Sequence, residues 1–441
     1  MGVVFSLFLQ ALLSVLFIIL ILRILLKKYE KVNITNLSPS EDDPSEQIRS
    51  IALDLSCYKK DKSLNWPLPR MKENYSYIHS VYKELNECLN KQYAIPSTAE
   101  WLLDNFYIIE EQAKILRRDL NKKSFSYLPL VQSDFLKGHS RIFACLLELV
   151  FNAHGEVDEE VLYTHLKSYQ TQTILFDREI WAIPLVLRLA LLEHIRCQCE
   201  KIKNTINQWK KADDIVEDLL KSRGEEESKG LKQLNALLKS GSEVNTIFIE
   251  HFLYRLRRSG LNYTHFVNLI DDLLSPYGKN AESIAHEEHY KQSINTLKMS
   301  NGISSLRYFT MMSWEELFES LSFVDQILRQ DPDGTYPKMN LASRNYYRGK
   351  VEELSFLFGV SPVSIAQEAI DLAKQALLSS RRKGIKSNKL MRMGHVGYYL
   401  IEKGRSDLKA KLGSNAEIPL KASSENHELS LALYLGSIFL F

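Results

Sequence analysis

The segment His286-Glu287-Glu288-His289 has the residue types that bind zinc and activate water. In the zinc-hydrolase motif two histidines stand four residues apart on one face of a helix, and the glutamate acts as general base. Here the histidines stand three residues apart, within a polar stretch. We therefore interpret the segment as a solvated helix surface and assign no metal to it.

Asp331 and Asp333 are a second pair of possible metal ligands, because carboxylate oxygens two residues apart can hold a divalent cation against a diphosphate. They lie in the sequence Asp331-Pro332-Asp333-Gly334, in which every residue favours a turn. The sequence therefore predicts a turn that ends a helix. We interpret it as a structural joint or docking surface and not as a metal site.

Cationic and aromatic residues follow this turn in two groups. One is Arg344, Tyr346, Tyr347 and Arg348, and the other is Tyr398 and Tyr399 behind His395. Tyrosine and arginine are common at interfaces, and aromatic faces stack on sugars, but a seam between helices would use the same residues. Both interpretations stay open. The candidate interaction site or structural joint comprises Arg329, Asp331, Asp333, Arg344, Tyr347, Arg348, His395 and Tyr398.

The arginines of this set are expected to neutralise its aspartates. Arg329, Arg344 and Arg348 should come within reach of Asp331 and Asp333, and that would leave no free carboxylate for a cation. Loss of Asp331 should then cost about 1 kcal/mol, the value of a cap or turn hydrogen bond.

Other catalytic signatures are absent from the sequence. It contains no glycine-rich phosphate-binding loop, no dinucleotide-binding fingerprint and no nucleophile elbow. We assign no catalytic residue, no cofactor and no metal, and expect no activity from the chain on its own.

The elements that must position these residues are helices. In Trp314–Arg329, apolar residues at helical spacing predict that Trp314, Leu317, Leu321, Val324 and Leu328 are buried. A second helix should start near Ala342. Further helices are expected at Ile142–Phe151, from Asp158 onward, and at Val244–Arg258, Thr264–Leu273, Ile284–Lys298, Arg344–Phe358 and Pro362–Ser380.

Two more helices have special features. Ser97 and Thr98, with Glu100, form a capping-box signal for the helix that continues through Leu116. Ile180–Ile206 is apolar on more than one face, so it should be the central helix of a bundle. The predicted fold class is all-α, a bundle of many helices with an N-terminal transmembrane helix.

Both ends of the sequence are apolar. Val3–Leu26 is long enough to span a bilayer, and Lys27, Lys28 and Lys31 follow it. Cations on that flank predict that the bulk of the chain lies in the cytoplasm. Leu429–Phe441 has thirteen residues, and we interpret it as the start of a truncated second membrane helix, with a docked C-terminal helix as the alternative.

These features divide the chain into five parts. They are an anchor (1–30), a linker (31–70), a helical bundle in two halves (71–220 and 221–425) and the truncated membrane segment (426–441). The boundary between the halves rests on the charged stretch Lys221–Lys229.

Composition excludes several classes of protein. The net charge of +2 shows no basic excess of the kind that nucleic-acid binding requires. Five scattered cysteines do not predict a disulfide framework and fit a reducing compartment. Glycine (18) and proline (12) are scarce in 441 residues, and few breakers favour long helices.

Five ordered blocks of the sequence resemble the N-terminal region of cyclic β-1,2-glucan synthases. The resemblance covers roughly Tyr93 to the C-terminus and is weaker around Gln208–Leu306. The blocks are Tyr93–Gln112, Glu179–Arg196, Ser313–Arg348, Val351–Leu354 and His395–Arg405.

The resemblance implies a setting at the bacterial inner membrane. Members of this family are very large membrane proteins that polymerise glucose from UDP-glucose and cyclise the product. The chain ends before any residue of the family's transferase domain, so no catalytic residue is carried over. The implied function is a non-catalytic, membrane-anchored region that supports or regulates a glycosyltransferase domain or subunit, its expected partner besides the membrane. The alternative is a free-standing, membrane-anchored helical scaffold for protein partners.

Overall fold

The computed structural model describes residues 67–120, 125, 128–131, 136, 138–221, 245–261, 263–383 and 392–415. Within these ranges the protein is all-α, as predicted, and a single bridge between Leu130 and Ser140 is its one β-type pairing. The predicted anchor, Cys57 and the apolar segment 426–441 lie outside the described residues. None of the described helices is by itself long and apolar enough to cross a bilayer, whereas Leu341–Phe358 and Pro362–Ser379 meet that requirement only together, as a pair bent by 112°.

The described ranges hold fourteen α-helices and two short 3-10 helices. In chain order they are α3 (Pro67–Asn90), α4 (Ser97–Asp119), α6 (Arg141–Asn152), α7 (Glu159–Gln170), α8 (Asp177–Lys221), α10 (Thr246–Ser259), α11 (Tyr263–Leu274), η2 (Ser275–Tyr277), α12 (Ala281–Met311), α13 (Trp314–Leu321), α14 (Phe323–Leu328), η3 (Tyr336–Lys338), α15 (Leu341–Phe358), α16 (Pro362–Lys383), α18 (Val396–Leu400) and α19 (Arg405–Asn415).

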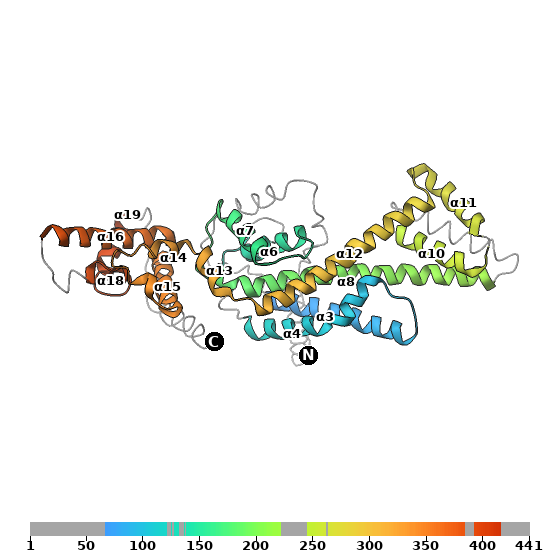
Figure 1. The fold of residues 1–441 in the computed structure, drawn as a ribbon, viewed down its shortest axis with the longest axis horizontal. Helices are drawn as coiled ribbons and strands as arrows, with labels where there is room; N and C mark the ends of the chain where they lie inside the picture. The colour runs from blue at the N-terminus through green and yellow to red at the C-terminus, as the bar shows by residue number, and fades with distance from the viewer. Residues whose placement is uncertain are drawn as a thin grey trace, which may run out of the picture.

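Helix α8 is the central helix, as its sequence predicted. It has 45 residues, and α3, α4, α6, α10 and α12 all pack against it. Leu187, Leu191 and Ile195 are fully buried, because α8 is surrounded along this stretch. The molecule is elongated, with α10 and α11 at one end and α16, α18 and α19 at the other (Figure 1).

Buried apolar side chains form three clusters. The first joins α3, α4, α6, α7, the first part of α8, the end of α12 and α13. The second joins the end of α8 with α10, α11 and the start of α12. The third lies within α14, α15, α16, α18 and α19. We call residues 67–321 the body and residues 323–415 the C-terminal unit. The predicted division of the bundle at residue 221 stays a prediction. Helix α12, which follows that residue in the chain, packs on α4 and α8, which begin before it.

Two local predictions were wrong. Pro96 stands at the N-cap position of α4 without a side-chain cap bond. The hydroxyls of Ser97 and Thr98 instead lie 3.1 and 3.0 Å from that of Thr296 on α12. The expected helix Trp314–Arg329 is two helices, because Ser322 between α13 and α14 is extended (φ −80°, ψ 106°) and caps α14.

The apolar face predicted for this stretch is largely confirmed. Leu317, Leu321, Val324 and Leu328 are buried, whereas Trp314 is half-buried. The break at Ser322 therefore leaves both short helices with their apolar side inward, although α13 faces the first cluster and α14 the third.

Candidate functional site

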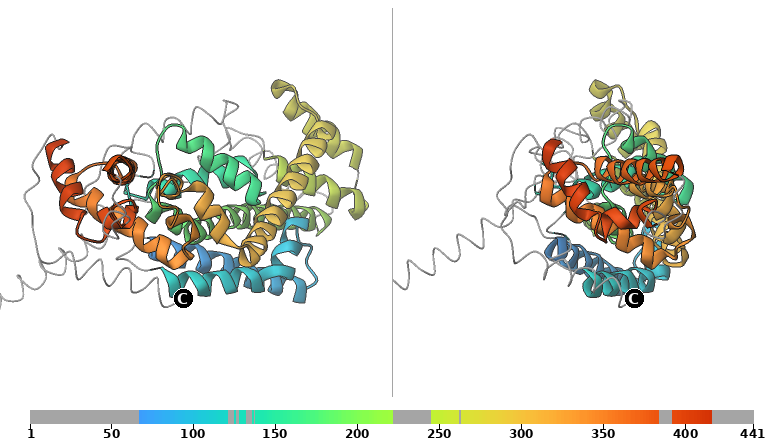
Figure 2. Two further views of the ribbon diagram at one scale, coloured as in Figure 1. Left: turned by 60° about the vertical axis from the view of Figure 1, so that its left-hand side comes forward. Right: turned by 90° about the vertical axis from the view of Figure 1, so that its left-hand side faces the viewer.

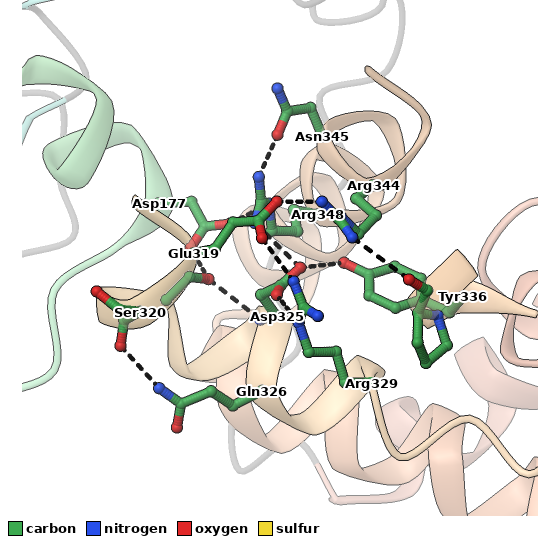
Figure 3. Close-up of polar contacts among 12 residues, drawn as sticks. Asp177, Glu319, Ser320, Asp325, Gln326, Arg329, Tyr336, Arg344, Asn345 and Arg348 are labelled. Carbon is green, nitrogen blue, oxygen red and sulfur yellow. Dashed lines mark hydrogen bonds and ion pairs between the residues drawn. The ribbon is translucent and has the colours of Figure 1, made fainter. Parts of the chain in front are cut away.

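A polar joint lies where the C-terminal unit meets the body. We define the joint by ten residues: Asp177 and Arg178 on α8, Glu319 on α13, Ser322 between α13 and α14, Asp325 on α14, Arg329 directly after α14, Tyr336 on η3, and Arg344, Arg348 and Glu352 on α15. Its centre is drawn in Figure 3. The apolar clusters on its two sides are separate, so charged and polar side chains make much of the contact here.

Ser322 positions the joint. Its hydroxyl donates to a carboxylate oxygen of Asp177, 2.6 Å away and 145 residues earlier in the chain. The same hydroxyl oxygen accepts the backbone N–H of Asp325 at 3.1 Å and so caps α14. The Ser322 side chain therefore caps α14 and attaches the break between α13 and α14 to the first turn of α8.

Arg348 lies between two carboxylates. Its Nε is 3.2 Å from Oδ2 of Asp177, and its Nη1 is 3.1 Å from Oδ1 of Asp325. The Arg348 side chain is 2% exposed and that of Asp325 is fully buried. Burial raises the pKa of Asp177, although the charge of Arg348 acts in the opposite direction. A buried charge is tolerated only when it is paired, so these three residues hold α8, α14 and α15 together.

Glu319 joins two further arginines at the edge of the joint. It pairs with Nη2 of Arg329 at 2.6 Å and also binds Arg344. Arg329 in addition donates from Nε to Asp325 at 2.5 Å, one helical turn earlier. The sequence-based expectation that Arg329, Arg344 and Arg348 pair with Asp331 and Asp333 was therefore wrong, because other carboxylates lie closer in the fold.

Asp331 takes part in a second network. It accepts hydrogen bonds from Nδ1 of His395 at 2.7 Å, from the backbone N–H of Val396 at 2.9 Å and from that of Tyr336 at 3.2 Å. Burial acts to raise the pKa of Asp331, but these donors outweigh it and hold the pKa below its usual value. The other ring nitrogen of His395, Nε2, lies 2.9 Å from the hydroxyl of Tyr347.

Tyr336 connects the two networks. Its backbone N–H donates to Asp331, and its hydroxyl donates to Oδ1 of Asp325 at 2.8 Å. Burial raises the pKa of the Tyr336 phenol, and so does the charge of Asp325. The phenol therefore stays neutral and keeps its proton for this hydrogen bond.

The structure brings most of the candidate residues together. Arg329, Arg344 and Arg348 lie in the charged network, and Asp331, Tyr347 and His395 lie in the second. Asp333 is exposed. Among the described residues, the one hydrogen-bond partner of its side chain is the hydroxyl of Thr335. Tyr398 is half-buried and packs edge-on against Tyr399 at 5.2 Å. The turn itself is confirmed: the N–H of Gly334 donates to the carbonyl of Asp331 at 2.9 Å.

Sequence reasoning missed the other residues of the joint: Asp177, Arg178, Glu319, Ser322, Asp325, Tyr336 and Glu352. A local signal existed for two of them, because Ser322 and Asp325 stand three residues apart like a capping pair. Asp325 and Arg329 are also spaced for an ion pair along a helix. Asp177 had no such signal, because its partners Ser322 and Arg348 are far away in sequence.

The chemistry that this arrangement supports is attachment rather than catalysis. The carboxylates of the joint are engaged by arginine, serine, tyrosine and backbone donors, so a substrate would have to displace internal bonds. Burial and the nearby charge of Asp331 raise the pKa of Tyr347, which makes it a poor nucleophile. Nowhere in the described ranges do three or more His, Cys, Asp or Glu side chains stand where they could hold a metal ion.

Glu287 and Glu288 of the histidine-flanked segment have structural partners. Glu287 pairs with Lys279 and Lys291, each at 2.6 Å. Glu288 accepts the hydroxyl of Thr246 on α10 at 2.9 Å. The segment thus helps to pack α12 against α10.

A pair inside the body, formed by the buried Cys145 and the half-buried His165, is also unsuited to catalysis. Sγ of Cys145 lies 3.4 Å from Nε2 of His165. Burial raises the pKa of the thiol well above its usual value and lowers that of His165 to about 4. Nucleophilic catalysis by cysteine needs a thiolate, whereas both of these groups are neutral near pH 7.

Comparison with known proteins gives one informative match. The chain is 27% identical over 351 residues to the cyclic beta-(1,2)-glucan synthase NdvB of Rhizobium meliloti (strain 1021). The match covers 79% of this chain but 12% of that protein, so the chain spans about an eighth of its relative's length. No protein-family model matches the chain. The chain is therefore distantly similar to one region of a cyclic beta-1,2-glucan synthase.

Proposed function

We propose that this chain is a non-catalytic helical region of a cyclic β-1,2-glucan synthase system. It would lie on the cytoplasmic side of a bacterial inner membrane and support or regulate a membrane glycosyltransferase. The observation that carries the proposal is the 351-residue similarity to part of NdvB. The joint fits this role, because its buried charges are bound to one another and attach two helical units firmly.

The test combines the chain with the rest of a synthase. A cyclic β-1,2-glucan synthase that lacks the matching region is expressed with and without this chain, and membranes are assayed with UDP-glucose and Mg²⁺ or Mn²⁺. We expect more β-1,2-glucan or more assembled synthase when the chain is present, and co-purification of the two. The chain alone should yield no glucan.

Two outcomes would contradict the proposal. Glucan made by the purified chain alone would show a catalytic site in it. Unchanged synthesis without co-purification would favour the second candidate, a free-standing membrane-anchored scaffold.

The double variant Asp177→Asn, Arg348→Met serves as a probe of the joint, since a supporting role requires that the two units keep their relative position.

A further inference from the structure

The last part of the C-terminal unit in sequence carries an unusual concentration of positive charge. Eleven lysines and arginines and only two acidic residues lie between Lys374 and Lys411, a net charge of +9. The whole chain carries +2, so the remaining residues together carry −7. Such asymmetry within one chain indicates an anionic partner for this end.

The fold places the described helices of this segment at one end of the molecule. Helices α16, α18 and α19 pack against one another, and they face the viewer when the molecule is seen end-on (Figure 2, right). We define the basic end as Lys374, Leu378, Arg392, Lys403 and Lys409. The last turn of α16 adds Arg381, Arg382 and Lys383 in sequence.

Part of this charge is not neutralised internally. Lys374 and Lys403 are exposed and Lys409 is half-exposed, and none of the three forms an ion pair with a described residue. Arg392 pairs with Glu402 at 3.6 Å, but both side chains are largely in solvent, 72% and 46% exposed. Screening makes such an exposed pair weak. The basic end therefore offers cations to an external partner.

An apolar side chain is exposed on the same helix as Lys374. Leu378 is 58% exposed on α16, one turn beyond Lys374 and one turn before Arg382. An exposed leucine one helical turn from an exposed lysine suits the boundary between lipid headgroups and acyl chains, where lysine and arginine stems extend to the phosphates. A nucleic acid or an acidic peptide would use the cations but would gain little from the leucine.

We propose that the basic end docks on the surface of an anionic lipid bilayer, independently of any membrane-spanning segment. The continuity of the chain supports this assignment: the apolar run Leu429–Phe441 starts eighteen residues after Lys411. Basic segments next to an apolar membrane segment are attracted to anionic headgroups. Lys374, Lys403 and Lys409 would face phosphates, and Leu378 would enter the headgroup layer.

The test uses the full chain in nanodiscs and a single label. A fluorophore is attached at Ser379→Cys, beside Leu378, and its quenching by a headgroup-attached quencher is measured. Discs contain either phosphatidylcholine alone or phosphatidylcholine with phosphatidylglycerol at about seven to three. The same label at exposed Ser293→Cys on α12 serves as a position far from the basic end, and the chain without either substitution gives the background.

We expect quenching at residue 379 in the anionic discs, with little in the neutral discs and little at residue 293. The triple variant Lys374→Glu, Lys403→Glu, Lys409→Glu should reduce it roughly ten-fold or more, because each lost cation weakens binding several-fold. The matched variant Lys72→Glu, Lys91→Glu, Lys211→Glu changes the net charge equally on the body, where all three lysines are exposed. It should leave the quenching unchanged.

Three results would overturn the proposal. They are equal quenching in neutral and anionic discs, equal loss in both triple variants, and no quenching in either disc. Binding of a soluble polyanion such as single-stranded RNA through the same three lysines, without lipid-dependent quenching, would assign the basic end to a different class of partner. Circular dichroism of each variant checks that the helices are intact.

Discussion

Nδ1 of His395 lies 2.7 Å from Oδ2 of Asp331, which joins two residues 64 positions apart. Because the pKa of Asp331 is lowered, its carboxylate is ionised near neutral pH and the imidazole nitrogen must be the donor. This contact attaches the segment that leads into α18 to the turn that follows α14. The Asp331 carboxylate, which the sequence analysis assigned to a structural joint and not to a metal site, is therefore bound by an imidazole and two backbone N–H groups.

Asp331→Asn should destabilise the C-terminal unit more than the loss of one turn bond would. An amide cannot accept all three hydrogen bonds as well as a carboxylate, and bonds to a charged group contribute about 1.5–3 kcal/mol each. We expect the free energy of unfolding to fall by roughly 2–4 kcal/mol in urea titrations. Asp333→Asn, at the exposed position two residues on, should change it by less than about 0.5 kcal/mol. Equal effects of the two variants would contradict this account of the turn.

Arg348→Met should uncouple the C-terminal unit from the body. The substitution leaves Asp177 and Asp325 buried beside one another without their shared cation, which typically costs about 3–5 kcal/mol. Urea unfolding of the single variants and of Arg348→Met with Asp325→Asn forms a double-mutant cycle, and we expect a coupling energy of about 1–3 kcal/mol.

The control for this cycle is Lys350→Met on the same helix. Lys350 pairs with Glu353 at 2.8 Å near the surface, so its loss should cost about 1 kcal/mol or less. Additive effects of Arg348 and Asp325 would show that the joint does not depend on their pairing.

Glu148→Gln should make the stability of the body less dependent on pH. Burial raises the pKa of Glu148 from its usual 4.5 to about 8, so the folded state keeps a proton that the unfolded state has lost. Between these two pH values unfolding releases this proton, and the free energy of unfolding therefore falls as pH rises. The contribution of Glu148 levels off above pH 8.

A glutamine has no proton to lose. At pH 7.5 the variant should be more stable than the wild type by on the order of 2–4 kcal/mol, and at pH 4 the two should be similar. Urea unfolding at a series of pH values measures the difference. A variant that is less stable at pH 7.5 would show that Glu148 is ionised and stabilised by a partner.

Gly397→Ala should disturb the contact between Tyr347 and His395. A β-carbon at this position in α18 would clash with the hydroxyl of Tyr347 and with Nε2 of His395. The tyrosine would have to move and its hydrogen bond would be lost, so we expect a loss of about 1–3 kcal/mol in thermal unfolding. Gly413→Ala in α19 has open space around it, and alanine there should be neutral or stabilise the helix by up to about 1 kcal/mol. Comparable losses at both glycines would argue against the clash.

The sequence by itself determined the local structure. Helical spacing of apolar residues predicted most of the helices and the central place of α8, because periodicity within one segment decides which of its faces is buried. Asp158 as the cap of α7 and the turn from Asp331 to Gly334 followed from side chains that bond to nearby backbone. The resemblance to a cyclic β-1,2-glucan synthase also needed no structure, since five ordered blocks carry it.

The partners of the charged side chains were decided only by the tertiary structure. Arg348 could have paired with any of several nearby acids, and it pairs with Asp177, 171 residues earlier, because the fold buries both side chains at the joint. Ser322 breaks a pattern that is apolar on one face throughout, because its hydroxyl binds Asp177. Ser97 and Thr98 also bind a residue on a distant helix, Thr296, instead of capping their own helix. Interactions between distant segments depend on how helices pack, and one sequence without its fold does not contain that geometry.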